Sequence, residues 1–558
     1  MKQNAKHPIR TTVLFLGIGL FLFFTVQYIL TPKWSEPAYE DVKFALEFYE
    51  LDRNELDVLF LGNSHLYYGV SPLKIYGDQK FVSFIIGSAN QRMPISYYLL
   101  KQALLFQRPK LVVLEVSSLM NEYTTLEYPW ERAAMFLRSP RCLLECANTY
   151  GELAASLDQD DKIETMKKFL IPIYRYHSRW SSLTEYDFQF FPTNTARMKG
   201  NQNVTDIKGA DISIEGMNSL ADSMRRMDAL WTISYENGQE SIEHEELEPL
   251  YYPTIYETEL EYFKKIVELC WENDILLLGV VIPATYNPVA HFSAWTRQRY
   301  EVVKDLLASL DVPYLDMMYD VDLGIDLGND SVDGGKHLNM RGAYKVSEYL
   351  GQYLKDNYDL PDHEDVRYER DLELYNSTLP VAMLQTELSF PAYIERLKNF
   401  NHNLTVCFAA SNCMTGRITE EDVEVFRSIG MQTDFLNMGV YDTFVGIWEH
   451  SANGTDTIPY EAASTRELQY ETETPEGLQI SLVSRGGVQG GYASINLNGE
   501  EYVQGGSSLH CVVYCNDTDT VIDTAYFDLF PHGDHCMHHL TPYTWLRNWE
   551  QLYTDKAA

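Results

Sequence analysis

Basic charge is scarce in this chain of 558 residues. It carries 44 lysines and arginines against 80 aspartates and glutamates, a formal net charge of −36. Such a surface repels phosphate backbones, which argues against nucleic acid as a partner. Polyanionic wall polymers would be repelled as well, unless a local basic groove overrides the mean field.

Cysteine is scarce too, with eight in the whole chain, so a disulfide framework does not hold the fold. Cys142 and Cys146, and likewise Cys511 and Cys515, are close enough in sequence to pair, but nothing requires it. The chain also lacks internal repeats and low-complexity tracts. A hydrophobic content of 45% with 13% aromatic residues indicates a globular protein, and the length predicts two or three domains.

Long hydrophobic runs are absent except at residues 11–30, TTVLFLGIGLFLFFTVQYIL. At about 1.5 Å per residue, this uncharged stretch spans the ~30 Å hydrocarbon core of a bilayer. Lys2, Lys6 and Arg10 precede it, so residues 1–10 should stay in the cytoplasm. A cleaved signal peptide is the competing interpretation, but the following QYILTPKW is a poor cleavage site. We therefore expect a single-pass protein of the cell membrane, with its domains outside.

Most of the chain alternates between short apolar runs and amphipathic runs. The predicted strands are 58–61, 81–86, 111–116, 275–282 and 313–316. The predicted helices are 95–106, 257–271, 292–310 and 341–357. This alternation predicts an α/β domain over 31–358, with a parallel sheet covered on both faces. Residues 120–255 interrupt it and are expected to form a mostly helical cap.

The C-terminal third has a different sequence pattern. Residues 359–400 begin with the charged stretch DLPDHEDVRYERD and contain Pro380 and Pro391, so we expect a linker and short helices there. From 401 to 558, strand-like segments such as LTVCFAA and LHCVVYC alternate with Gly and Asn turns. This pattern predicts a separate β-rich domain.

The candidate nucleophile is Ser64, in the stretch DVLFLGNSHLYYGVSP. It follows a predicted buried strand, and Gly62 lets the backbone turn so that the hydroxyl projects. The candidate base is His337, in DSVDGGKHLNMRGAYKVSEYL, with Asp333 able to curl back to its ring. His65, beside the serine, is expected to point elsewhere on the turn. Taken singly, each residue has a more common interpretation. A serine at a strand end is more often part of a turn or a helix cap, and a histidine before a helix is more often a solvated residue.

These two stretches resemble the SGNH (GDSL-type) hydrolase superfamily over about residues 50–358. They are most similar to membrane-anchored bacterial members such as the teichoic-acid D-alanyl transfer and alginate O-acetylation proteins. The resemblance implies a flavodoxin-like, three-layer fold and a catalytic set of Ser64, Asp333 and His337. The spacing D-x-x-x-H has one residue more than the usual D-x-x-H, which leaves Asp330 as an alternative partner for His337.

The same resemblance implies an oxyanion hole. The glycine of the family's second conserved block corresponds to Gly87 in FIIGSANQRMP. The family's usual Gly-x-Asn-Asp block is absent, and VVLEVSSLMNEY stands in its place. The hole would then use the amides of Ser64 and Gly87, with a side-chain donor from Asn90 or Gln91. One lost donor can cost ~10²–10³ in turnover, so this departure bears on the rate.

Two further stretches contain binding or ligand residue types. Arg175, His177 and Arg179 in YRYHSRW form a basic group that could bind an anionic substrate, or could anchor the cap through ion pairs. The run FPHGDHCMHH at 530–539 is rich in potential metal ligands. Ligands crowded into one run rarely close a tetrahedron, so we expect a polar loop there, and neither metal nor cofactor.

The tail resembles an interleukin-like inducer (GG) domain, a β-sandwich, at GGYASINLNGEEYVQGGSSLHCVVYCNDTDTVIDTAYFD, residues 490–528. Residues 403–430 resemble a segment that usually follows it, so the order is permuted. GSSLH also stands where that family commonly has RGLN. The resemblance implies a glycan-binding or packing accessory.

The sequence therefore predicts an extracytoplasmic, membrane-anchored SGNH-type serine esterase or O-acyltransferase. Its substrates would be acyl esters of a cell-surface glycan or wall polymer. The resembling families imply a multispanning membrane acyltransferase as a partner. The rival prediction is a non-catalytic, glycan-binding scaffold for cell-envelope assembly. The absent asparagine block favours the scaffold, and the Ser–Asp–His set opposes it.

Overall fold

The structure is a computed structural model of the chain. Besides single residues at 136, 148, 167, 208, 210, 212 and 549, it describes residues 6–32, 41–120, 171–188, 233–236, 239–242, 255–284, 290–325, 330–332, 337–412, 418–487, 491–505, 508–529 and 535–540.

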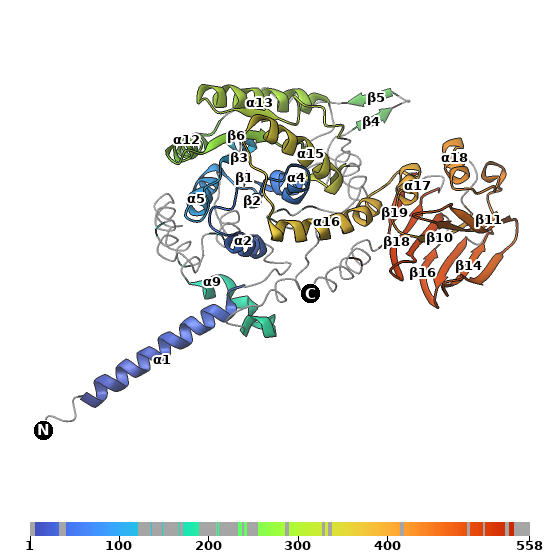
Figure 1. The fold of residues 1–558 in the computed structure, drawn as a ribbon, viewed down its shortest axis with the longest axis horizontal. Helices are drawn as coiled ribbons and strands as arrows, with labels where there is room; N and C mark the ends of the chain where they lie inside the picture. The colour runs from blue at the N-terminus through green and yellow to red at the C-terminus, as the bar shows by residue number, and fades with distance from the viewer. Residues whose placement is uncertain are drawn as a thin grey trace.

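The N-terminal helix α1 (Lys6–Leu30) projects away from the body of the molecule (Figure 1). Its segment Arg10–Leu30 has a mean hydropathy of 2.3 and is long and apolar enough to cross a membrane. Most of its apolar side chains are exposed, from Val13 to Val26. A helix that is apolar all round and uncovered by protein fits a lipid environment. Helix α2 (Asp41–Glu50) follows and packs on the body.

A five-stranded parallel sheet forms the centre of the main body, in the order β2-β1-β3-β6-β7. Renumbered along the chain, this is the order 2-1-3-4-5 of flavodoxin-like folds, which confirms the predicted fold class. The sheet places the ends of β1 and β2 side by side, with Gly62 opposite Gly87. The strands are β1 (Val58–Gly62), β2 (Ser83–Gly87), β3 (Leu111–Glu115), β6 (Leu276–Val281) and β7 (Tyr314–Asp316).

Alternating side chains of these strands enter two different cores, which makes the three layers. Val58 and Phe60 belong to the core that α15 covers, whereas Leu59 and Leu61 belong to the core that α5 and α12 cover. Burial of both faces explains why the strands read as continuous apolar runs. The covering helices are α3 (Ser64–Gly69), α4 (Pro72–Gln79), α5 (Met93–Ala103), α12 (Glu257–Glu272), α13 (Ala290–Ser309) and α15 (Met340–Asn357).

The predicted linker is instead a packed helical unit. Helix α16 (Val366–Gln385) continues through Pro380, and Pro391 lies in the first turn of α17 (Phe390–Lys398), where a missing amide proton costs nothing. Tyr368 of α16 is fully buried and donates its hydroxyl proton to the Ser83 carbonyl at 2.7 Å. This segment therefore contributes to the core, and the prediction of short linker helices is corrected.

The predicted cap is described only in part. Its described helices are η1 (Ser117–Met120), α9 (Pro172–Tyr176), η2 (His177–Ser181) and η3 (Glu185–Phe188). An antiparallel pair, β4 (Ile233–Glu236) and β5 (Gln239–Ile242), departs from the expected helical pattern. Residues 121–135, with most of 137–170 and 189–232, lie outside the described part of the chain.

The C-terminal region is β-rich, as predicted. A six-stranded sheet, β12-β11-β10-β17-β18-β19, packs on a four-stranded sheet, β13-β14-β15-β16, and an apolar cluster fills the space between them. Helices α18 (Glu420–Ser428) and η4 (Phe435–Asn437) complete the region. The strands are β10 (Leu404–Ser411), β11 (Thr443–His450), β12 (Thr457–Ser464), β13 (Leu468–Glu473), β14 (Gln479–Arg485), β15 (Tyr492–Leu497), β16 (Glu500–Gly505), β17 (Leu509–Cys515), β18 (Thr520–Phe527) and β19 (Met537–His539).

Candidate active site

Ser64 is the first residue of α3, directly after β1. Asn63 caps this helix, because its Oδ1 accepts a hydrogen bond from the amide of His65 at 2.9 Å. Gly62 is required for a packing reason, since a Cβ there would lie 2.5 Å from the Cβ of Glu115 on β3. The close approach of β1 and β3 thus fixes the turn that presents the serine at the carboxyl edge of the sheet.

His337 reaches the same edge from the far end of the α/β region. It begins β9 (His337–Leu338), which pairs with β8 (Ser331–Val332) so that Val332 lies opposite His337. Asn339 then caps α15, as Asn63 caps α3. The Nε2 atom of His337 lies 2.7 Å from Oγ of Ser64, although 273 positions separate them. This distance is that of a nucleophile in contact with its base.

The ring of His337 is held by two side chains from the serine's own helix. It stacks on Tyr68, with ring centroids 4.6 Å apart and planes at 29°. It also lies 5.6 Å from the ring of His65, so the expectation that His65 points elsewhere on the turn is wrong. Tyr68 carries no signal in the sequence beyond its position four residues after Ser64, one helical turn away.

Of the two candidate carboxylate partners of His337, the structure describes only Asp330. Asp333 lies in 333–336, between the two hairpin strands and outside the described residues. The buried Asp330 carboxylate is engaged by α15, with Oδ2 2.6 Å from Nζ of Lys345 and Oδ1 3.6 Å from Nε of Arg341. These ion pairs give Asp330 a structural role, tying the hairpin to α15, and argue against it as the alternative orienting residue.

The two predicted side-chain donors to the oxyanion, Asn90 and Gln91, have different surroundings in the loop after β2. Gln91 is buried, and its side-chain nitrogen donates to Oγ of Ser96 at 3.0 Å and to the Ile86 carbonyl at 3.5 Å. Both amide protons are therefore committed to the loop, so the prediction of Gln91 as a donor is corrected. Asn90 is exposed, with a left-handed φ of 54°. Gly87 has a packing role of its own, because a Cβ there would lie 2.8 Å from the Tyr67 ring.

A buried polar group behind the serine was missed by the sequence reasoning. Glu115, the last residue of β3, accepts hydrogen bonds from the hydroxyl (2.9 Å) and the amide (3.0 Å) of Ser117. The Ser117 hydroxyl oxygen accepts from Nδ2 of Asn63 at 3.1 Å. Burial raises the pKa of the Glu115 carboxyl to about 7. This group occupies the segment where the asparagine block is absent, and it supports Asn63, the residue before Ser64.

The basic group of the cap lies at the end of α1. Arg179 is buried, donates to the Leu30 carbonyl at 2.8 Å and pairs with Asp187 at 2.8 Å. The predicted alternative of an ion-paired anchor therefore describes Arg179, whose guanidinium is enclosed and not free for a substrate. In the same segment, His177 is exposed, and the Arg175 guanidinium lies over the Tyr176 ring.

The described part of the histidine-rich run does not gather into one ligand cluster. His535 pairs with Asp422, His538 stacks on Tyr526, and His539 pairs with Asp523. His532 and Asp534 lie outside the described residues. The run also contains β19 (Met537–His539), which departs from the expected loop.

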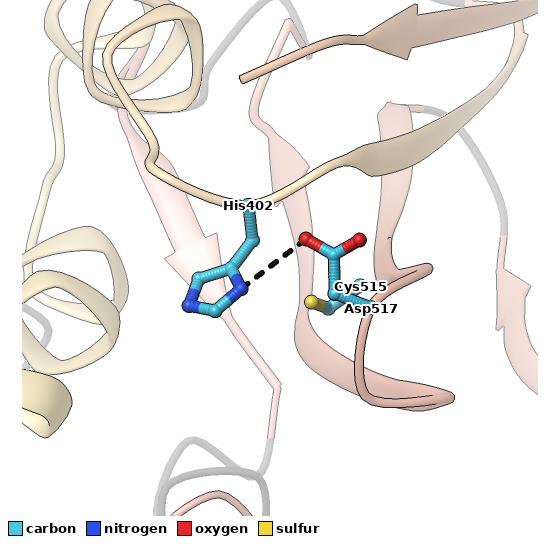
Figure 2. A group of neighbouring side chains, drawn as sticks. All are labelled: His402, Cys515 and Asp517. Atoms are coloured by element: carbon cyan, nitrogen blue, oxygen red, sulfur yellow. Dashed lines mark ion pairs between the residues drawn. The ribbon is translucent and has the colours of Figure 1, made fainter. Parts of the chain in front are cut away.

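A different group of potential metal ligands lies in the β-rich region. His402, Cys515 and Asp517 place their ligand atoms within 4.8 Å of one another (Figure 2). The ring of His402 faces Asp517, with Nδ1 3.3 Å from Oδ2. The Asp517 carboxylate also accepts from the amide and the side chain of Asn403, at 2.9 and 2.8 Å. These contacts join the segment of His402 and Asn403 to the turn at Asp517, and they explain why the three side chains lie together.

Comparisons with known proteins give a coarse picture. No protein-family model matches the sequence, and no curated protein matches it. A proposed acylhydrolase from Bacteroides fragilis has 11% identity and a TM-score of 0.26, covering 56% of this chain and 94% of its own. A GDSL-like lipase from Bacteroides thetaiotaomicron has 10% identity and a TM-score of 0.27, covering 57% and 99%. The fold class rests on the strand order described above.

Proposed function

We propose that the chain is a membrane-anchored, extracytoplasmic serine esterase or O-acyltransferase of the SGNH type. The observation that carries the proposal is the 2.7 Å contact between Ser64 Oγ and His337 Nε2, at the carboxyl edge of a parallel sheet. Functional groups of open parallel sheets gather at this edge. A serine and a histidine brought together there from opposite ends of a domain form the core of an acyl-transfer site.

The proposed reaction is covalent. Ser64 attacks the ester carbonyl while His337 takes the hydroxyl proton, then returns it to the departing alcohol and leaves an acyl-serine. Water or an acceptor hydroxyl then gives its proton to His337 and attacks the acyl-serine, and the bond to the Ser64 oxygen breaks as His337 returns the proton to that oxygen. The Ser64 amide, in the first turn of α3, would donate to the oxyanion, with Gly87 and Asn90 as further proposed donors. Asp333 is proposed to orient the His337 ring.

The substrate class follows from the proposed anchoring. A chain fixed to the membrane by α1 acts on esters within reach of the bilayer surface, such as acyl groups of a cell-surface glycan or wall polymer. A multispanning membrane acyltransferase is the proposed acyl donor if the reaction is transfer. The rival function is a non-catalytic glycan-binding scaffold. It is favoured by the Glu115–Ser117 pair, which stands where a third oxyanion donor would be expected.

Reaction of the full-length protein with a fluorophosphonate probe tests the proposal. Wild type should be labelled and should hydrolyse p-nitrophenyl acetate, whereas Ser64→Ala and His337→Ala should both fall to background. The double variant should be no worse than either single one, because the two groups act as a unit. The acyl content of the native surface polymer should fall in a Ser64→Ala strain.

Two aspartate variants serve as matched controls. Asp333→Ala should lower turnover with little change in thermal stability. Asp330→Ala should lower thermal stability, because it leaves Lys345 without its buried partner. An unlabelled wild type, together with normal polymer acylation in the Ser64→Ala strain, would leave the scaffold function standing.

A further inference from the structure

A short segment of the cap, residues 171–188, forms a collar around the end of α1. It consists of α9, η2 and η3, and all three pack on α1. In Figure 1 the collar segment α9 lies where α1 meets the body of the protein. The collar is therefore the part of the described protein surface that continues directly from the proposed membrane helix.

Polar contacts fix the collar to the last turns of α1. The amide of Ile173 donates to Oε1 of Gln27 at 2.7 Å, and Arg179 donates to the Leu30 carbonyl. The Arg179–Asp187 pair, with both side chains almost fully enclosed, holds η2 and η3 together. Asp187 further accepts from the Thr184 amide at 2.8 Å. The collar thus has a fixed height along the helix axis.

The collar carries three large aromatic side chains that are exposed. Trp180 is 74% exposed, Phe188 57% and Tyr174 53%. Exposed serines at 178 and 181 and the exposed His177 accompany them. These three aromatic residues lie within fifteen positions of the sequence. Leaving so much apolar surface in contact with water is unfavourable, which marks the segment as an interaction surface. Such a mixture of aromatic and small polar residues suits the boundary between lipid tails and headgroups.

The height of the collar agrees with that boundary. From Arg10 to Val26 the side chains of α1 are exposed, apart from the half-buried Thr25, whereas Gln27 and Leu30 are covered by protein. Counted from Thr11 at about 1.5 Å per residue, a hydrocarbon core of ~30 Å takes about 20 residues and ends near Leu30. Arg179 of the collar donates to the Leu30 carbonyl, so the outer boundary of that core lies at the height of the collar.

We propose that the collar is a membrane-contact surface, with Tyr174, Trp180 and Phe188 inserted at the outer lipid–water interface beside α1. This inference rests on the proposed anchoring by α1 and extends it. A helix alone leaves the attached domain free to swing, whereas a collar seated in the lipid holds the body at one height and tilt. The buried Arg179–Asp187 pair would keep the three aromatic residues aligned with the interface.

Quenching of tryptophan fluorescence by brominated lipid tests the proposal on the full-length protein. The protein is placed in phosphatidylcholine vesicles with and without phosphatidylcholine brominated near the headgroup. Trp180→Phe should reduce the share of the emission that the brominated lipid quenches. Trp271→Phe is the matched control, because Trp271 is 80% exposed on α12, which lies away from α9 in Figure 1. It should leave the quenched share equal or higher.

Flotation with the vesicles separates the two failures. A protein that floats but whose Trp180→Phe variant keeps the wild-type quenched share would overturn the collar and leave the anchor intact. A protein that does not float would overturn the anchor and the collar together. Fluorophosphonate labelling of Ser64 is read independently in the same samples, so neither result depends on the esterase activity.

Discussion

At the scale of single residues, the least expected feature is an acid of raised pKa directly behind the candidate nucleophile. Glu115 is fully enclosed, and its hydrogen-bond chain through Ser117 ends on Asn63, the cap of α3. Burial disfavours the ionised form, which raises the carboxyl pKa from an ordinary 4.5 to about 7 in the folded protein. Close to neutral pH, the charge behind Ser64 therefore changes with pH.

The sign of the resulting pH dependence follows from this raised pKa. The unfolded chain releases the proton near pH 4.5 and the folded chain near pH 7, so Glu115 lowers the free energy of unfolding as pH rises through that window. Glu115→Gln stays neutral and should gain stability relative to wild type as pH rises from 4.5 to about 7, with no further gain above that. Glu115→Ala should cost about 1–3 kcal/mol, because Asn63 and Ser117 lose their buried partner, and it should also lower kcat.

Urea unfolding of the three proteins at several pH values, with ester hydrolysis measured in parallel, checks these expectations. A wild type and Glu115→Gln with the same pH dependence of stability would contradict the raised pKa. A Glu115→Ala variant with unchanged kcat would show that the support of Asn63 does not matter for turnover.

The site could be predicted only as far as local signals reach. Gly62–Ser64 and the stretch around His337 have recognisable spacing, and the structure brings Ser64 and His337 into contact. The neighbours of His337 could not be predicted, because stacking by Tyr68 depends on the angle at which α3 leaves β1. The oxyanion prediction failed at Gln91 for a similar reason, since its partners Ser96 and Ile86 meet it only once the loop is folded.

At the scale of elements, the α/β part was predictable because each strand is buried on both faces and reads as a continuous apolar run. The five predicted strands agree with the observed ones within two residues at each end. The helices of segment 359–400 could not be predicted in the same way. The many charged residues on the exposed side of α16 obscure, in the sequence, the apolar stripe formed by Leu372, Val381 and Leu384. Pro380 added to the error, since a proline usually ends a helix.

The short strand β19 should make the β-rich region sensitive to pH. Burial alone would lower the pKa of His539, but the Asp523 carboxylate, 2.9 Å from Nδ1, raises it above the ordinary 6.5. Nε2 donates to the Glu387 carbonyl at 2.8 Å, so the folded protein favours the charged ring. This contribution to stability is complete below the unfolded pKa and is lost as pH rises through the folded pKa, above 6.5.

Thermal unfolding of His539→Gln across this range measures the effect. The variant should melt below wild type at acidic pH, and the difference in Tm should shrink as pH rises above 6.5. His538→Gln is the control on the same strand: its ring stacks on Tyr526, and the variant keeps the His539–Asp523 ion pair, so the pH dependence that this pair gives should remain. A constant difference in Tm for His539→Gln would rule out the charged ring.

At the scale of the whole molecule, the two main parts share one apolar core. A single cluster of buried side chains runs from Val58 and Val346 through Leu384 and Phe390 to Val406. Trp549 adds to this connection, since its Nε1 donates to the Ser377 carbonyl at 3.0 Å and its ring meets Phe400. We therefore expect the α/β part and the β-rich part to unfold together, despite their different textures in the sequence.

Glu387 is the polar counterpart of this shared core. It lies between α16 and α17 and pairs with Arg341 of α15 and, at 2.8 Å, with Arg396 of α17. Although burial alone would raise its pKa, the two guanidinium groups hold the pKa below the usual range, so the carboxylate stays ionised at neutral pH. Arg341 also faces Asp330, so this acid joins the hairpin of His337 to the helices that carry the β-rich region.

Removing this carboxylate should separate the two parts. Glu387→Ala removes the nearer of the two carboxylates that Arg341, which is mostly buried, is paired with. We expect a loss on the order of 3 kcal/mol, because breaking an enclosed ion pair costs more than losing an exposed one. In scanning calorimetry, the single transition of wild type should split into two. Glu424→Ala is the matched control: its pair with Arg427 on α18 is largely exposed, so it should cost less than about 1 kcal/mol. Two transitions already in wild type, or a Glu387→Ala trace matching that of Glu424→Ala, would mean that the parts unfold independently and that the α16–α17 unit acts as a tether.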